Sequence, residues 1–142
     1  MIDIGTGTGL PLKKFMETST ADRVLAIDIN TSYVKTATER FKDDKRVEVR
    51  YMNFMDVDSD FKEKFDVIYF GFSFMLMPDK PLALKKAAQL LKPNGKIFLF
   101  LTLYNKKNSV VEFFKPKMRY ITSIDFGETM YASEVYFILL DA

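Results

Sequence analysis

The sequence predicts an α/β fold in which a doubly wound, mostly parallel sheet carries helices on both faces. Apolar runs of strand length alternate with segments of helical periodicity, which is the pattern of parallel βαβ units. Residues 24–29 form a continuous buried-strand run, and residues 96–104 are apolar at nearly every position. A glycine-rich loop follows the first apolar run, where a buried strand turns sharply into a helix.

The first half of the chain predicts three strands with two helices between them. The strands are expected at residues 1–4, 24–29 and 47–52. Apolar residues recur at helical spacing in the two intervening segments: Leu12, Phe15 and Met16, then Val34, Ala37 and Phe41. Asn30 or Thr31 is placed to cap the second of these helices.

The second half predicts two further strands, at residues 65–70 and 96–104, after a charged loop or helical turn over residues 56–64. The helix between these strands should start near Asp79 and stop at residues 92–95. Its inward stripe is expected to be Leu84, Ala87, Ala88 and Leu91. Residues 133–142 fit a helix or a strand, and the spacing of Val135, Ile138 and Leu139 favours the helix.

The composition describes one globular domain over residues 1–142. Hydrophobic residues make up 48% of the chain and charged residues 28%, and the net charge of +2 gives no general attraction to nucleic acid or membranes. No apolar run approaches the roughly 18 residues of a transmembrane span, and no secretion signal opens the chain. We therefore expect a cytoplasmic protein without a membrane partner.

Two residue types are absent from the whole chain, and their absence excludes several chemistries. Without Cys there is no disulfide, thiolate nucleophile or Cys-type zinc site. Without His the commonest metal ligand and general base is missing, so a Ser-His-Asp hydrolase is excluded. No metal site is expected.

The glycine loop separates the possible ligand classes. Gly5, Gly7 and Gly9 alternate after the first strand, and Asp3 lies two residues before them. The third Gly of the dinucleotide fingerprint would fall at position 10, which is Leu10, and the P-loop Lys is missing. The pattern D-x-G-x-G-x-G resembles motif I of the class I S-adenosylmethionine-dependent methyltransferases. A tight turn without a ligand is the alternative interpretation.

The resemblance extends over residues 1–104 and implies a Rossmann-like fold that binds S-adenosyl-L-methionine. The strand FDVIYF and the segment LLKPNGKIFLF are similar to the family's fourth strand and L-K-P-G-G turn, with Asn94 replacing one Gly. Asp28 ends the second strand at the position where the family binds the ribose hydroxyls; capping or a turn is its alternative role. The implied cofactor-binding residues are Asp3, Gly5, Thr6, Gly7, Gly9, Asp28, Ile29, Asn53, Phe54, Phe70 and Gly71.

The position that the family uses for adenine departs from its usual pattern. An Asp commonly follows the third strand, and the matching residue here is Asn53, whose side-chain oxygen can also accept a hydrogen bond from the adenine amino group. The Phe54 amide is placed to donate to the ring. Asp56, three residues further on, is the competing candidate.

The methyl acceptor is not identified by any motif. The segment after the fourth strand and the end of the fifth predict a substrate pocket made of Phe72, Ser73, Phe74, Met75 and Tyr104, although any one of them is more often a core residue. The (Asp/Asn)-Pro-Pro-aromatic signature of nucleobase amino methylation is absent. The Lys and Arg residues within 106–119 are more often a solvated helix face, so a small molecule or protein acceptor is favoured over nucleic acid.

The two ends of the chain suggest an incomplete methyltransferase core. The chain starts on the first strand, without the helices that usually precede it in the family, and the C-terminal hairpin is also expected to be missing. Strand five would then be an open, apolar sheet edge, through which a homo-oligomer or aggregate is expected to form.

The sequence therefore predicts an S-adenosylmethionine-dependent methyltransferase with an unidentified acceptor and no assigned catalytic residue. A catalytically inactive, cofactor-binding or scaffolding subunit is the alternative. A nucleotide-dependent oxidoreductase is disfavoured by Leu10.

Overall fold

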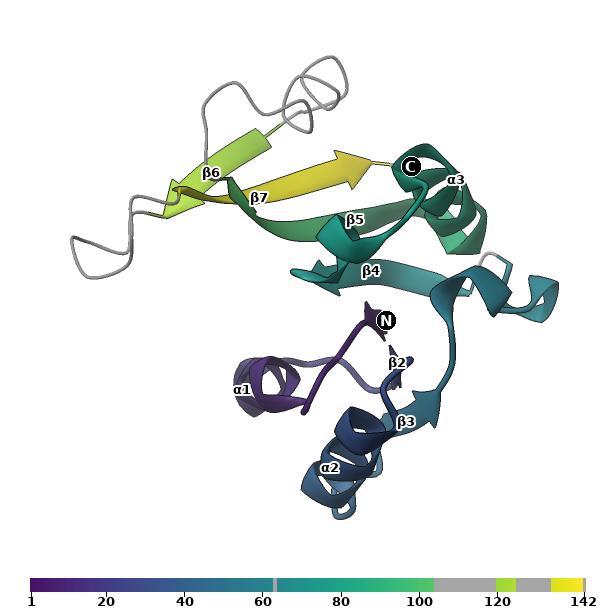
Figure 1. Cartoon of the computed structure of the whole chain (residues 1–142), viewed down its shortest axis with the longest axis vertical. Coiled ribbons are helices and arrows are strands. Elements are labelled where there is room, and N and C mark those ends of the chain that lie inside the picture. The colour runs from purple at the N-terminus through teal and green to yellow at the C-terminus, as the bar shows by residue number, and fades with distance from the viewer. Residues whose placement is uncertain (63, 104–119, 125–133, 142) are drawn as a thin grey trace.

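A computed structural model describes residues 1–62, 64–103, 120–124 and 134–141 of the chain. Its described residues form one seven-stranded sheet in the order β3-β2-β1-β4-β5-β7-β6 (Figure 1). The strands are β1 Ile2–Ile4, β2 Val24–Asp28, β3 Val47–Tyr51, β4 Phe65–Gly71, β5 Leu91–Leu103, β6 Tyr120–Ile124 and β7 Glu134–Asp141.

The first five strands are parallel, and their order reverses between β1 and β4. The chain moves outward from β1 through β2 to β3, and then crosses back to place β4 on the other side of β1. In doubly wound sheets, ligands bind at such a switch point, beyond the carboxyl ends of the strands. The predicted fold class is confirmed, and it brings the loops after β1, β2 and β4 to one edge of the sheet.

Helices cover both faces of the sheet (Figure 1). The helices are α1 Leu10–Thr18, α2 Thr31–Phe41 and α3 Lys80–Leu90, and three short 3-10 helices are η1 Phe54–Asp56, η2 Ser59–Phe61 and η3 Ser73–Leu76. Asn30 caps α2 by accepting from the Ser32 and Tyr33 N–H groups, and Asp79 caps α3. No helix in the described residues is long and apolar enough to cross a membrane.

The core lies in two layers. On one face, α1 and α2 pack on β2 through the buried residues Leu12, Met16, Val24, Ala26 and Phe41. On the other face, α3 and two of the 3-10 helices cover alternate residues of β1, β2, β4 and β5. The side chains of β1 show the division, because Ile2 and Ile4 enter the second layer, whereas Asp3 points to the face of α1 and α2.

The inward face of α3 differs from the predicted stripe. The helix buries Ala83, Ala87 and Leu90, whereas Leu84 is partly buried and Ala88 is exposed. Leu91 is buried, but it is the first residue of β5. Several apolar phases fit this sequence at helical spacing, and the small side chains of Ala83 and Ala87 suit the face closest to the sheet.

The predicted C-terminal helix is wrong. Residues 134–141 form β7, which pairs antiparallel with β5 from Lys96↔Asp141 to Leu103↔Glu134. Helical spacing within EVYFILL is outweighed by the unpaired edge of β5, because an apolar strand edge gains a full ladder of hydrogen bonds from a β-prone segment.

The predicted open edge at strand five is therefore also wrong. β7 covers that edge and β6 pairs antiparallel with β7, so the C-terminal strand pair expected to be missing is present (Figure 1). The homo-oligomer was predicted from an unpaired β5, and that premise no longer holds.

Candidate cofactor site

Three glycines form the loop that joins β1 to α1, and two of them are required by packing. Gly5, Gly7 and Gly9 all have positive φ, at 70°, 58° and 74°. A Cβ on Gly5 would lie 2.4 Å from the Cβ of Ser73, and a Cβ on Gly9 would lie 2.7 Å from the Phe41 ring. These two positions exclude a side chain whether or not a ligand binds.

Gly7 differs from its two neighbours in the loop. No heavy atom lies within 4 Å of the position of a Cβ on Gly7, so its surroundings in the protein leave room for a side chain. The positive φ favours glycine at position 7. Packing within the protein does not account for the open space beside its Cα. A ligand can reach the main chain through this space.

The loop is held in place by the strands and helices around it. The N–H groups of Gly5 and Thr6 both donate to the Ile27 carbonyl, at 2.9 and 3.0 Å. Arg40 on α2 donates from Nε to the Thr8 carbonyl at 2.8 Å. Because these bonds fix the loop from both sides, its backbone is preorganised.

Asp28 joins the end of β2 to the glycine loop. Its Oδ2 accepts from the Gly7 N–H and its Oδ1 accepts from the Asn30 N–H, each at 2.8 Å. The turn role considered for Asp28 is thus present in the structure. A carboxylate has about four acceptor positions, so two hydrogen bonds orient this group and leave acceptor positions for a ligand.

Asp3 is a buried carboxyl beside the same loop. Burial raises its pKa to about 7, because a charged group is poorly solvated there, and the negative charge of Asp28 raises the pKa further. The nearby Thr6 hydroxyl opposes this shift, yet it is buried without a hydrogen bond of ordinary geometry. A buried acid and an underused hydroxyl together fit a cationic group with hydrogen-bond donors.

The ends of β2 and β3 carry the predicted adenine residues. Ile29, directly after Asp28, exposes 67% of its side chain. The Asn53 side-chain oxygen caps η1 by accepting from the Met55 N–H at 3.0 Å, and Asp56 is exposed at the end of that turn. Phe54 is buried with its ring against Phe70, so only its backbone faces the predicted site.

Among the predicted substrate-pocket residues, Phe74 is corrected by the structure. Its side chain is fully buried and packs edge-to-face on Phe70, because η3 turns it into the core under α3. Ser73 is also buried, and its hydroxyl donates to the Ile4 carbonyl. Met75 is partly buried against the same core.

Phe72 is the member of this set with a largely exposed side chain, at 46%. Gly71 precedes it, and a Cβ there would lie 3.0 Å from the Tyr69 ring. Tyr104 and the basic residues of 106–119 lie outside the described residues.

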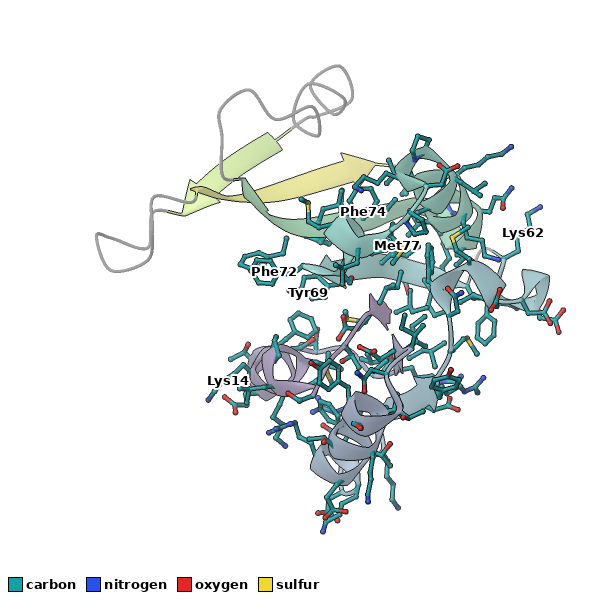
Figure 2. The ribbon with its side chains drawn as sticks, viewed as in Figure 1. Lys14, Lys62, Tyr69, Phe72, Phe74 and Met77 are labelled. Carbon is teal, nitrogen blue, oxygen red and sulfur yellow. The ribbon has the colours of Figure 1, made fainter. Side chains whose placement is uncertain are left out.

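Tyr69 is a further residue beside this site, and no sequence motif indicates it. Tyr69 and Asp3 are register partners on β4 and β1, so both side chains lie on the same face of the sheet. Burial raises the pKa of the Tyr69 phenol, and the charge of Asp3 raises it further. Figure 2 shows Tyr69 and Phe72 close together near the end of β4. The pairing of Tyr69 with Asp3 joins residues that lie far apart in the sequence, so no local pattern indicates it.

A hollow at the opposite edge of the sheet contains none of the predicted site residues. It is lined by charged side chains of both signs, among them Arg23, Lys64, Asp66 and Lys92. Lys92 pairs with Asp66 across it at 2.9 Å. This hollow lies at the amino ends of the parallel strands, away from the switch point.

Known proteins match this chain in both sequence pattern and fold. The sequence pattern of a family described as a methyltransferase domain matches residues 2–99. Among curated proteins, none matches the chain by sequence. The chain superposes on the CurJ carbon methyltransferase with a TM-score of 0.79 and 15% identity, over 99% of this chain and 47% of the other.

Two further structures show the same fold. A SAM-dependent methyltransferase from Aquifex aeolicus gives a TM-score of 0.69 at 18% identity, over 98% of this chain and 80% of the other. The methyltransferase CalH, solved as a complex with SAH, gives 0.73 at 16% identity, over 99% and 51%. The chain thus spans about half the length of CurJ and CalH. The glycine loop and Asp28 at the end of β2 are consistent with the family pattern that matches residues 2–99. The chain belongs to the methyltransferase domain family.

Proposed function

We propose that the chain binds S-adenosyl-L-methionine and transfers its methyl group to an acceptor. The observation that carries the proposal is the open Cα of Gly7, in a loop that contacts the buried acid Asp28 and lies beside the buried Asp3, at the switch point of the sheet. This cofactor carries an ammonium group, ribose hydroxyls and an adenine ring. The site offers a carboxyl, an oriented carboxylate and an exposed apolar side chain for these three parts.

Each part of the cofactor has a matching group in the site. Asp3 and Thr6 would hold the ammonium group, and the backbone of Gly5 to Gly9 would lie against the methionine end. Asp28, already oriented by two N–H donors, would accept from the ribose hydroxyls. The Ile29 side chain would cover one face of the adenine, with Asn53 and the Phe54 amide at its edge and the backbone of Phe70 and Gly71 closing the side toward β4.

The bound cofactor supplies an electrophilic methyl group, and the protein supplies position. Transfer to an acceptor needs the nucleophile held close and in line, which is where most of the catalysis arises in such reactions. The loop is fixed by the Ile27 carbonyl and by Asp28 before any ligand binds. The apolar segment after β4 would exclude water from the reacting atoms. We assign no proton-transferring side chain.

We infer a small molecule or a protein as acceptor rather than nucleic acid. The structures of similar fold include enzymes described as a carbon methyltransferase and as a putative sarcosine dimethylglycine methyltransferase. The segments that directly follow β1, β2 and β4 (residues 5–9, 29–30 and 72–79) contain no Lys or Arg, so they offer no cationic side chain to a phosphate backbone.

Calorimetric titration tests the proposal on the parent chain. S-adenosylhomocysteine is expected to bind with one site per chain, and S-adenosylmethionine to compete for it. NAD should give no heat beyond dilution, because Leu10 occupies the position of the third Gly in the dinucleotide fingerprint. Binding of NAD, or no binding of S-adenosylhomocysteine at millimolar concentration, would contradict the assignment.

A further inference from the structure

Phe72 has a backbone conformation that its residue type rarely adopts. Its φ is 63° and its ψ is −11°, in the left-handed region. The other non-glycine residue with positive φ in the described part of the chain is Asn94, and Asn tolerates this region whereas a bulky aromatic residue is strained in it. Burial does not account for the strain, because the residue is 46% exposed.

Several contacts hold Phe72 in this conformation. Its N–H donates to the Phe100 carbonyl on β5 at 3.1 Å. Its ring packs edge-to-face on Phe100, with centroids 4.3 Å apart and planes at 82°. The next residue, Ser73, is fixed to β1 by its bond to the Ile4 carbonyl. Strained residues persist where the surroundings over-determine them, and they cluster at functional sites.

The position of Phe72 is beside the glycine loop. Ile4 and Phe70 are register partners, so Phe72 lies just past the end of β4, as Gly5 and Thr6 lie past the end of β1. Ser73 packs so closely on Gly5 that a Cβ there has no space. Figure 2 shows Phe72 at that end of β4, beside Tyr69. The backbone of Phe72 is therefore close to the proposed cofactor site, and its ring lies over the adjoining end of β5.

The segment that carries Phe72 is uncharged, and the side chain of its polar residue, Ser73, is buried. Residues 71–77 contain no charged side chain, and Leu76 is 83% exposed. A charged group of the acceptor would find no ionic partner among these side chains. A fixed aromatic ring instead offers a flat face on which another planar group can stack.

We propose that Phe72 is a specificity-determining residue, whose rigidly held ring stacks on a planar, apolar group of the methyl acceptor. This inference rests on the proposed methyltransferase function and narrows its substrate class. The hydrogen bond and the ring contact with Phe100, together with the fixed position of Ser73, hold the left-handed backbone and the ring in place before the acceptor arrives.

The test compares two small probes that share a carbon skeleton. 2-Naphthol is planar and aromatic, and decahydro-2-naphthol is not planar. Both are titrated into the 142-residue chain with S-adenosylhomocysteine present and again with it absent. The parent is expected to bind 2-naphthol at least about tenfold more tightly than the saturated analogue.

Two substitutions distinguish the effect of the aromatic ring from the effect of an apolar side chain. Phe72→Asn suits the left-handed backbone and removes the ring, and Phe72→Leu keeps an apolar side chain. Both should weaken 2-naphthol binding by about tenfold, with affinity for S-adenosylhomocysteine changed less than threefold. Tyr51→Ala, which removes a 63% exposed aromatic side chain from β3, is the matched control and should change neither affinity. Thermal unfolding confirms that each variant folds.

Three results would overturn the inference. These are equal binding of both probes to the parent, no binding of 2-naphthol to the parent at millimolar concentration, and unchanged 2-naphthol binding by Phe72→Asn and Phe72→Leu. The titration of S-adenosylhomocysteine tests the proposed function independently. If S-adenosylhomocysteine does not bind, the probe titrations in its absence still decide the role of Phe72.

Discussion

The loop after β1 and the segment after β4 flank the same switch point, but they differ in polarity and in the origin of their strain. The loop is in contact with two buried acids, Asp3 and Asp28, and has glycine at each of its three positive φ angles. The segment after β4 has no charge from residue 71 to residue 77 and places a phenylalanine at its positive φ. If each segment served only as a tight turn, glycine would be favoured at the positive φ angles of both.

The difference teaches which half of a site can be inferred from sequence. A ligand that lies against the main chain needs glycines and oriented acids, and these residue types are rare together elsewhere. A ligand that stacks on an apolar surface needs residues that also fill cores. Phe72 and Phe74 are two residues apart and of one type, yet the first is 46% exposed and the second fully buried.

Among the residues around the glycine loop, Asp3 is expected to have the largest effect on folding stability. Its pKa of about 7 lies above its ordinary value of 3.8, so between these values the folded chain binds a proton that the unfolded chain lacks. Stability conferred by this proton is present at low pH and lost as pH rises through about 7. The difference corresponds to about 4 kcal/mol. Asp3→Asn should therefore be more stable than the parent at pH 8.

Urea unfolding of the parent and Asp3→Asn at pH 5 and pH 8 measures this effect. The gain from the substitution should be larger at pH 8 than at pH 5, while S-adenosylhomocysteine binding is lost at both. Parallel pH profiles for the two proteins would show that Asp3 carries no burial cost.

The next largest effect should separate the three glycines. Gly5→Ala and Gly9→Ala place a Cβ at 2.4 Å from Ser73 and 2.7 Å from Phe41, respectively. Overpacking together with the positive φ should cost about 3 kcal/mol of folding free energy. Gly7→Ala meets no atom within 4 Å and should cost about 1 kcal/mol. Denaturant midpoints of the three variants check the order, and equal losses would refute the distinction.

A smaller effect is expected at the link between loop and β2. Asp28→Ala leaves the N–H groups of Gly7 and Asn30 without their acceptor. The loss should be about 2 kcal/mol of stability, together with weaker cofactor binding. Asn30→Ala is the control, because it removes a helix cap worth about 1 kcal/mol and should leave affinity unchanged. A stability loss at Asp28 without any loss of affinity would assign it to the turn alone.

Most of the fold up to residue 103 was predictable because the apolar runs are long and separated by turn residues. Asn30 and Asp79 have the residue types that cap helices, and both do so. Asn94 replaces a family Gly without penalty, because its φ of 66° is one that Asn tolerates. Residues 134–141 were misassigned because local spacing does not show that β5 offers them a free edge.

The candidate site was also predictable only in part. The glycine pattern located the loop, and strand length located Asp28 at the end of β2. The bond from Ser73 to Ile4 and the pairing of Tyr69 with Asp3 join residues more than 60 positions apart, so no local pattern signals them. The strain at Phe72 is a property of backbone dihedrals, which a run of apolar residues does not indicate.

The central claim is that the open Cα of Gly7 marks where the cofactor meets the main chain, and Gly7→Asn tests it most directly. Asn tolerates the left-handed backbone but fills the open space. Asn94→Ala, which strains a residue of similar φ in the turn between α3 and the paired part of β5, is the matched control. By calorimetry, we predict that Gly7→Asn folds and loses S-adenosylhomocysteine binding at least a hundredfold, whereas Asn94→Ala binds like the parent. Parent-like affinity in a folded Gly7→Asn variant would contradict the account.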